Sequence, residues 1–162
     1  LTAIDLMRQA SDRLQAAVIA QHEVRVELST LIGEGLVTLG DYDRAEPVLE
    51  QAAREGRREL GDAHVLTLHA RLNQAHMLRL RGRVAEQHRE LLALEPLLRE
   101  AGRHTPLVQV QGLQHLALNA VDRGAFGEAE AHAREGFALA RRALGDHHPD
   151  TVAGAVLLAL AH

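Results

Sequence analysis

The stretch that decides the fold is LVTLGDYDRAEPVLEQA, residues 36–52, in which a glycine separates two segments with helical spacing. Its turn glycine, Gly40, has counterparts at Gly82 and Gly124, each 42 residues further along the chain. Small residues precede these glycines by seven positions and continue the step towards the C-terminus: Gly33, Ala75, Ala117 and Ala159. A fixed period of this length is typical of a solenoid built from stacked helical repeats.

Two further positions follow the same period. At the position five residues after each glycine stand Ala45, Gln87 and Ala129. At the position twelve residues after each glycine stand Ala52, Leu94 and Gly136. The linker GDAHVLT at 61–67 returns after two periods as GDHHPDT at 145–151. Because the side chains at a contact set the distance between helices, these small residues predict helices that approach closely in pairs.

The order of a small residue, then G-x-aromatic-x-x-A, an apolar residue and alanine resembles the tetratricopeptide repeat. The 42-residue period, AEPVLEQA and RRALGDHHPDT are similar to the longer, kinesin-light-chain kind of this repeat. The middle copy departs from the pattern, with Val84 where Tyr42 and Phe126 stand, and with Gln87 in place of alanine. The resemblance implies an all-α, right-handed superhelical solenoid of antiparallel helix pairs.

Composition restricts the class of protein. Of 162 residues, 46% are apolar and 2% aromatic, so the core must consist of Leu, Val and Ala, which suits helices better than a β-sandwich. Cysteine is absent, which excludes disulfides, cysteine-based zinc sites and thiol nucleophiles. The net charge is −4, and the charged residues of both signs are interspersed, without the basic block typical of nucleic-acid binding. No apolar run approaches the ~20 residues of a membrane span. We therefore expect a cytoplasmic protein that binds neither nucleic acid nor membrane.

The helical spacing predicts eight helices in a single array. Their expected ranges are 1–20, 23–39, 42–60, 65–81, 84–101, 106–123, 126–143 and 149–161. Residues 1–20 would be the second helix of a partial repeat or a cap. Three repeats would follow at 23–62, 63–104 and 105–147, and 148–162 would be the first helix of a fourth repeat or a cap.

Local signals refine these helices. Pro47 lies slightly late for the first turn of its helix and predicts a small distortion there, and Pro96 predicts a kink or break in the helix over 84–101. Asp146 or His147 is the expected N-cap of the last helix.

The resemblance also implies a binding surface. Tetratricopeptide arrays bind peptides or proteins on a concave groove lined mainly by the first helix of each pair, and repeat position carries that groove to this chain. The expected groove residues are Glu27, Thr30, Glu34, Val37 and Thr38 in repeat one, His69, Leu72, His76, Arg79 and Leu80 in repeat two, and Gln111, Gln114, Leu118, Val121 and Asp122 in repeat three. The Lys/Asn clamp that chaperone-binding relatives use for a terminal carboxylate is absent at these positions. Arg79 is the candidate partner for one acidic group of a ligand.

Signals of catalysis are missing from the sequence. The eleven histidines include no HExxH motif, and His69 with His76 would need a third ligand to hold a metal ion. Ser11, Ser29 and the threonines lack a neighbouring His/Asp pattern, and no glycine-rich phosphate loop is present. We therefore expect a scaffold that binds proteins, without enzymatic activity, cofactor or metal.

Two alternatives remain open. The last helix carries Val156, Leu157, Leu158 and Leu160 and is very apolar for the end of a solenoid, so more chain or a partner is expected to cover it. A homodimer formed symmetrically through this helix is the first alternative. The second is a small-molecule or metal sensor that uses His69, His76 and Arg79.

A last expectation concerns the role of the array. The pattern of residues in the N-terminal part of the sequence is similar to that of repeat regions attached to bacterial serine/threonine kinases and transcriptional regulators. This similarity suggests a regulatory array that recruits a protein for a neighbouring effector domain.

Overall fold

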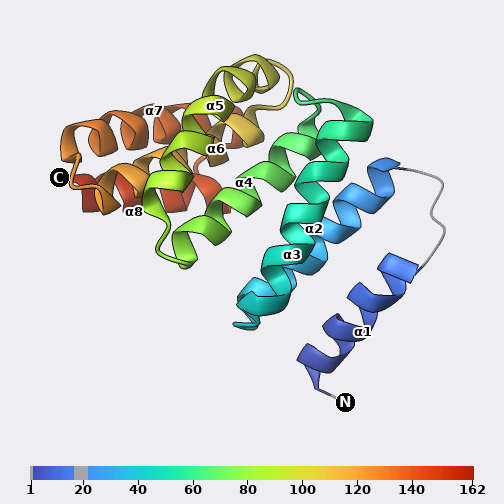
Figure 1. Ribbon diagram of the computed structural model, residues 1–162. Coiled ribbons are helices and arrows are strands. Elements are labelled where there is room, and N and C mark those ends of the chain that lie inside the picture. The colour runs from blue at the N-terminus through green and yellow to red at the C-terminus, as the bar shows by residue number, and fades with distance from the viewer. Residues whose placement is uncertain (1, 17–21) are drawn as a thin grey trace. The chain divides into compact units, whose positions relative to one another are not determined.

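The computed structural model describes residues 2–16 and 22–162, and within these ranges the chain forms eight α-helices (Figure 1). They are α1 (Ala3–Ala16), α2 (His22–Thr38), α3 (Tyr42–Glu55), α4 (Val65–Leu80), α5 (Val84–Gly102), α6 (Pro106–Asp122), α7 (Phe126–Leu144) and α8 (Pro149–Ala161). A π-helical turn, η1 (Gly56–Leu60), continues α3. The predicted all-α repeat fold is confirmed. The predicted first helix also included residues 1 and 17–20, which lie outside the described ranges.

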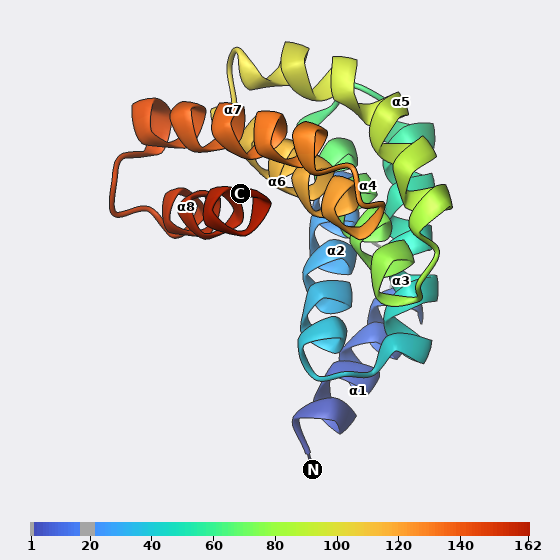
Figure 2. The ribbon, with the colours of Figure 1, turned by 90° about the vertical axis from the view of Figure 1, so that its left-hand side faces the viewer.

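The chain divides into two compact units, Leu1–Met77 and Leu78–His162, whose boundary falls inside α4. In the first unit, α2 packs against both α1 and α3. In the second unit, α6 packs against α5 and α7, and α8 lies beside α7 and also contacts α6 (Figures 1 and 2). Within each unit, these consecutive helices are therefore neighbours in space, as a helical repeat requires.

The three turn glycines adopt the same backbone conformation. Gly40, Gly82 and Gly124 have φ values of 78°, 73° and 74°, the left-handed region that ends a helix at low cost for glycine. The residue after each glycine donates its backbone N–H to a carbonyl five residues earlier, at 2.8–2.9 Å. This hydrogen bond is the hallmark of the Schellman motif, and its recurrence every 42 residues confirms the period.

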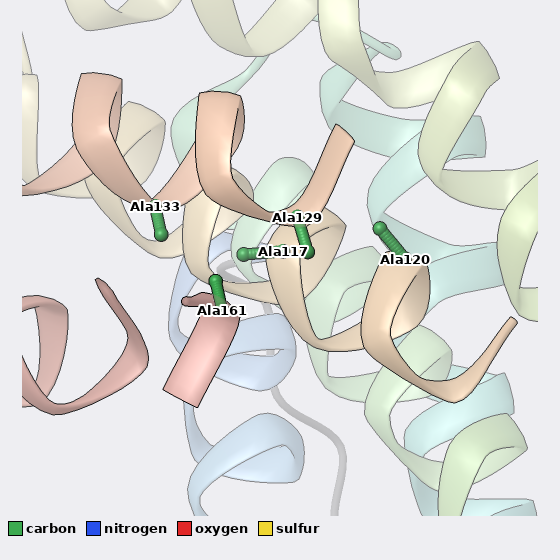
Figure 3. Packing of buried hydrophobic residues seen from close by; sticks show 5 residues of the cluster. All are labelled: Ala117, Ala120, Ala129, Ala133 and Ala161. Carbon is green, nitrogen blue, oxygen red and sulfur yellow. The ribbon is translucent and has the colours of Figure 1, made fainter. Parts of the chain in front are cut away.

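Small residues bring the paired helices together. A Cβ atom added at Gly33 would lie 2.4 Å from Leu49 Cδ2, so a larger residue there would force the Leu49 side chain to move. In the second unit, the contact between α6, α7 and α8 is a cluster of buried alanines: Ala117, Ala120, Ala129, Ala133 and Ala161. Figure 3 shows Ala117 beside Ala129 where α6 meets α7. The sequence prediction of closely paired helices is therefore confirmed in both units.

The positions that repeat after each glycine belong to the core. Ala45, Gln87, Ala129, Ala52, Leu94 and Gly136 are all buried. The central copy keeps this burial with a polar side chain, because Gln87 Oε1 accepts a hydrogen bond from Asn119 Nδ2 at 2.9 Å. Asn119 also donates to the backbone carbonyl of Val84 at 3.1 Å. A polar contact between α5 and α6 thus replaces the alanine contact of the neighbouring repeat.

Neither proline interrupts its helix, and the bend of α5 agrees with a kink at Pro96, one of the two predicted outcomes. Pro47 lies within an uninterrupted α3, which changes to π-helical hydrogen bonding only at Gly56. Pro96 does not break α5, which is one helix that changes direction along its length (Figure 2). A proline removes one backbone hydrogen bond, whereas the buried side chains of Leu94 and Leu98 on either side of Pro96 hold the helix in place.

Neither of the two predicted N-caps of α8, Asp146 or His147, was correct. His148 is the N-cap, and its Nδ1 accepts a hydrogen bond from the Asp150 backbone N–H at 3.2 Å. Asp146 instead accepts a hydrogen bond from Arg141 Nε at 2.8 Å. Since Pro149 occupies the first helical position, the residue before it is the one whose side chain reaches the first free N–H groups.

Candidate functional site

The predicted groove residues of the first repeat lie on α2, and one of them is not at the surface. Glu27 and Thr38 are exposed, and Glu34 is half-buried. Thr30 is 1% exposed, and its Oγ1 donates to the backbone carbonyl of Val26 at 2.8 Å. The prediction that Thr30 lines the groove was wrong, because the side of α2 that carries Thr30 faces the core.

A polar pair joins α2 to α4 in the first unit. His69 Nε2 lies 3.2 Å from Glu34 Oε1. The hydrogen bond from His69 lowers the pKa of the Glu34 carboxyl, while partial burial acts in the opposite direction. Asn73 adds a further hydrogen bond to this carboxyl, and its Nδ2 also donates to the His69 backbone carbonyl at 3.0 Å. Two predicted groove residues, Glu34 and His69, are therefore brought together by adjacent first helices.

The other predicted residues of α4 differ in exposure. Leu72 is 1% exposed and belongs to the core, so its assignment to the groove was wrong for the same reason as that of Thr30. His76 and Arg79 are half-buried. Within the second unit, Arg79 Nε donates to Asp122 Oδ2 at 2.6 Å and its Nη2 donates to Asp122 Oδ1 at 3.3 Å. The guanidinium expected to meet a ligand's carboxylate thus already holds a carboxylate of this chain.

Three of the five predicted residues of α6, Gln111, Gln114 and Leu118, are half-exposed, and one of these three has a structural partner. Gln114 Nε2 donates to the backbone carbonyl of Asp150 at 2.8 Å, which ties α6 to the first turn of α8. Gln111 and Leu118 lie on the same helix and keep part of their surface open to solvent. Of the three, Gln111 and Leu118 are therefore the better candidates for contact with a ligand.

An apolar strip on α2 was not among the predicted groove residues. Its members Val24, Leu28 and Leu31 are exposed. Val26 and Leu36 form the core side of the same helix. The sequence does contain a signal for this strip. The small residue Gly33 marks the side of α2 that faces α3, and these three residues lie on another side of the helix.

No group of three or more His, Cys, Asp or Glu side chains that could hold a metal ion occurs among residues 2–16 and 22–162. In the same part of the chain, no helix has the length and hydrophobicity to cross a membrane.

Comparison with known families matches residues 32–66 and 112–150 to the tetratricopeptide repeat. The chain carries tetratricopeptide repeats. The matched segments contain the turns at Gly40 and Gly124. No curated protein matches the chain. Tetratricopeptide repeats are generally modules of protein–protein interaction and form a family of non-catalytic scaffolds.

The segment between the two matches holds the central repeat, with the turn at Gly82. This repeat has Val84 and Gln87 where the others have an aromatic residue and alanine, and the buried pair of Gln87 with Asn119 takes over the contact. This central segment thus keeps the backbone turn and the burial of its neighbours with different side chains.

Proposed function

We propose that the chain is a non-catalytic scaffold that binds a peptide or another protein along the open side of its first helices. The observation that supports this proposal is that Glu34 and His69 meet across adjacent first helices, beside the exposed Glu27 and Thr38. The tetratricopeptide repeats in the chain supply the general role in protein binding. The scaffold would recruit its partner for an attached effector domain.

The charges of this surface bear on the kind of ligand. Arg79 is held by Asp122, so a ligand carboxylate would compete with an internal one. Glu27 is exposed and lies about two helical turns from Glu34 on the same side of α2. A ligand segment with a basic residue at α2 therefore fits this surface better than the acidic group expected from the sequence.

The test is an affinity capture from lysate with three baits, followed by titration of the captured segment as a synthetic peptide. The baits are the unchanged chain, the groove variant Glu27→Ala/His69→Ala, and a control variant, Glu50→Ala/Arg134→Ala. Both control residues lie on second helices, on α3 and α7. We expect a partner that binds the unchanged chain and the control variant, and that is lost from the groove variant.

Circular dichroism establishes that all three baits are folded. Equal capture by all three would place the binding surface elsewhere and contradict the proposal. Loss from the control variant alone would move the surface to the second helices.

A further inference from the structure

The linkers before α4 and α8 share one backbone geometry and carry a histidine at the same place. Gly61 and Gly145 have φ values of 94° and 90°. Three residues after each glycine stands a histidine, His64 or His148, whose backbone carbonyl accepts a hydrogen bond from the N–H four residues further on, at 3.0 and 3.1 Å. This is the first hydrogen bond of the helix that follows, so each histidine is an N-cap residue.

The imidazole of each histidine completes the cap in the same way. His64 Nδ1 accepts a hydrogen bond from the Leu66 backbone N–H at 3.2 Å, and His148 Nδ1 accepts one from the Asp150 backbone N–H at the same distance. A histidine nitrogen accepts a hydrogen bond only while it carries no proton. Histidine gains its charge within about pH 5–8, so both caps belong to the neutral form of the ring.

The two caps differ in what an added proton would meet. At His148, the carboxylate oxygen Asp150 Oδ2 lies 3.6 Å from Nδ1, so a protonated Nδ1 has an acceptor on the same turn. At His64, the side chain in the corresponding position is that of Leu66, which cannot accept a hydrogen bond. Protonation there places two N–H groups against each other and adds a positive charge at the positive end of the α4 dipole.

The charged groups around His64 do not offset this loss. Glu23 of α2 lies 3.4 Å from Nε2, the other ring nitrogen, and its side chain is 66% exposed. An exposed ion pair of this kind contributes less to stability than an N-cap hydrogen bond. Asp62, two residues before His64, is already paired with Arg57 of η1 and Arg71 of α4. Acid therefore weakens this cap.

The surroundings of the second cap are compatible with the opposite behaviour. Asp146 and the exposed His147 precede it, and the Asp146 carboxylate accepts a hydrogen bond from Arg141 Nε of α7 at 2.8 Å. From α6, Gln114 donates its amide to the backbone carbonyl of Asp150 at 2.8 Å, a bond that does not involve the Asp150 carboxylate. A protonated imidazole at this cap therefore keeps a carboxylate partner.

We propose that His64 is a proton-sensitive N-cap that releases the first turn of α4 as the pH falls, while His148 keeps α8 capped. The released turn directly precedes His69, which lies 3.2 Å from Glu34 of α2. Acidification thus acts on the start of one helix of the first unit and leaves the equivalent start in the second unit in place. The device rests on the geometry of the linkers and does not depend on the proposed peptide groove.

NMR spectroscopy tests this device one residue at a time. The ring nitrogen shifts of His64 at pH ~8 should show an unprotonated Nδ1 and a protonated Nε2. On acidification to pH ~5, the Leu66 amide should lose its hydrogen bond, which the temperature coefficient of its proton shift reports, and the Cα shifts of residues 65–68 should move towards random-coil values. Loss of one N-cap should raise the ratio of frayed to helical first turn roughly fivefold. The amide of residue 150 and the Cα shifts of residues 149–152 should not change in this way.

Two variants serve as matched controls. His64→Asn keeps a good N-cap that takes up no proton, so residues 65–68 should stay helical at both pH values. Asp150→Leu gives the second cap the side chain found at the first, so the first turn of α8 should now fray in acid as well.

Several results would overturn the proposal. One is a protonated Nδ1 in neutral His64, and another is a Leu66 amide that keeps its hydrogen bond at pH ~5. Acid fraying that persists in His64→Asn, or a first turn of α8 that fails to respond in Asp150→Leu, would contradict the roles of these side chains. Loss of helical shifts spread evenly through α2 and α3 would also overturn it, because the proposal confines the change to the start of α4.

Discussion

Ala117→Leu is the sharpest test of the way the helices pair. Ala117 is fully buried in the alanine cluster between α6 and α7, and the neighbouring Ala129 and Ala133 have no side-chain atoms that can rotate away (Figure 3). An isobutyl group at this position can be accommodated only if the two helices move apart. Overpacking of this kind costs about 1–3 kcal/mol. At about 2–4 °C per kcal/mol for a chain of this size, the melting temperature should fall by roughly 2–12 °C.

The repeat supplies a control at an equivalent position. Ala159 stands one period after Ala117 but is exposed on α8, so Ala159→Leu should change the free energy of unfolding by less than about 0.5 kcal/mol. Both variants are unfolded with urea and followed by far-ultraviolet circular dichroism, at protein concentrations low enough to prevent association. An unchanged midpoint for Ala117→Leu, or an equal loss from both variants, would refute the assignment of Ala117 to the close contact between the helices.

Three further changes test individual features. Gly124→Ala should lower the free energy of unfolding by about 1–2 kcal/mol, measured by urea denaturation, because alanine is strained at the φ of 74° that this turn requires. Gln114→Ala removes the hydrogen bond to the Asp150 carbonyl, so the amides of α8 should exchange with solvent faster while those of α2 are unaffected. Glu34→Gln tests the pair with His69: the lowered pKa of Glu34 stabilises the fold above the usual carboxyl pKa, and this contribution is lost as the pH falls through the lowered value. The variant should therefore be less stable than the unchanged chain at pH ~7 by under about 1 kcal/mol, and as stable as the unchanged chain in acid. Urea titrations at both pH values measure this difference. A difference in stability that grows on acidification would contradict the pairing.

The repeat period predicted those features that depend on the backbone and on small residues. Gly40, Gly82 and Gly124 all have the left-handed conformation, and Gly33 and Ala117 lie where helices touch. Both features are local, because a turn of fixed length needs a positive φ and a close contact excludes large side chains. The sequence of a single repeat is enough to specify both the turn and the close contact.

Features that depend on several neighbours could not be predicted in this way. A first helix has neighbours on more than one side, so repeat position alone did not show that Thr30 and Leu72 fall on the covered side. The π-helical turn at Gly56 lies where a Cβ atom would come within 2.8 Å of Thr67 Oγ1, and this approach involves the start of α4.

The pairing of Arg79 with Asp122 likewise required coordinates. Neither residue stands out from other charged surface residues in the sequence, and the two lie 43 positions apart in the chain. The sequence placed both on the expected groove and left open whether they face a ligand or each other. Charged side chains that share a surface can neutralise one another, and a site prediction from repeat position does not test for this.

The order of the helix contacts also has a kinetic consequence. Within each unit, the contacts described above join elements that are adjacent or next but one in the chain, as in α2 with α3 or α6 with α8. Chain segments therefore close short loops when they fold, and chains with such local contacts fold fast. Stability in such a fold is a sum of terms between neighbours, so opening can begin at an end and stop partway. Hydrogen exchange should accordingly be fastest in α1 and α8 and slowest in the interior helices of each unit.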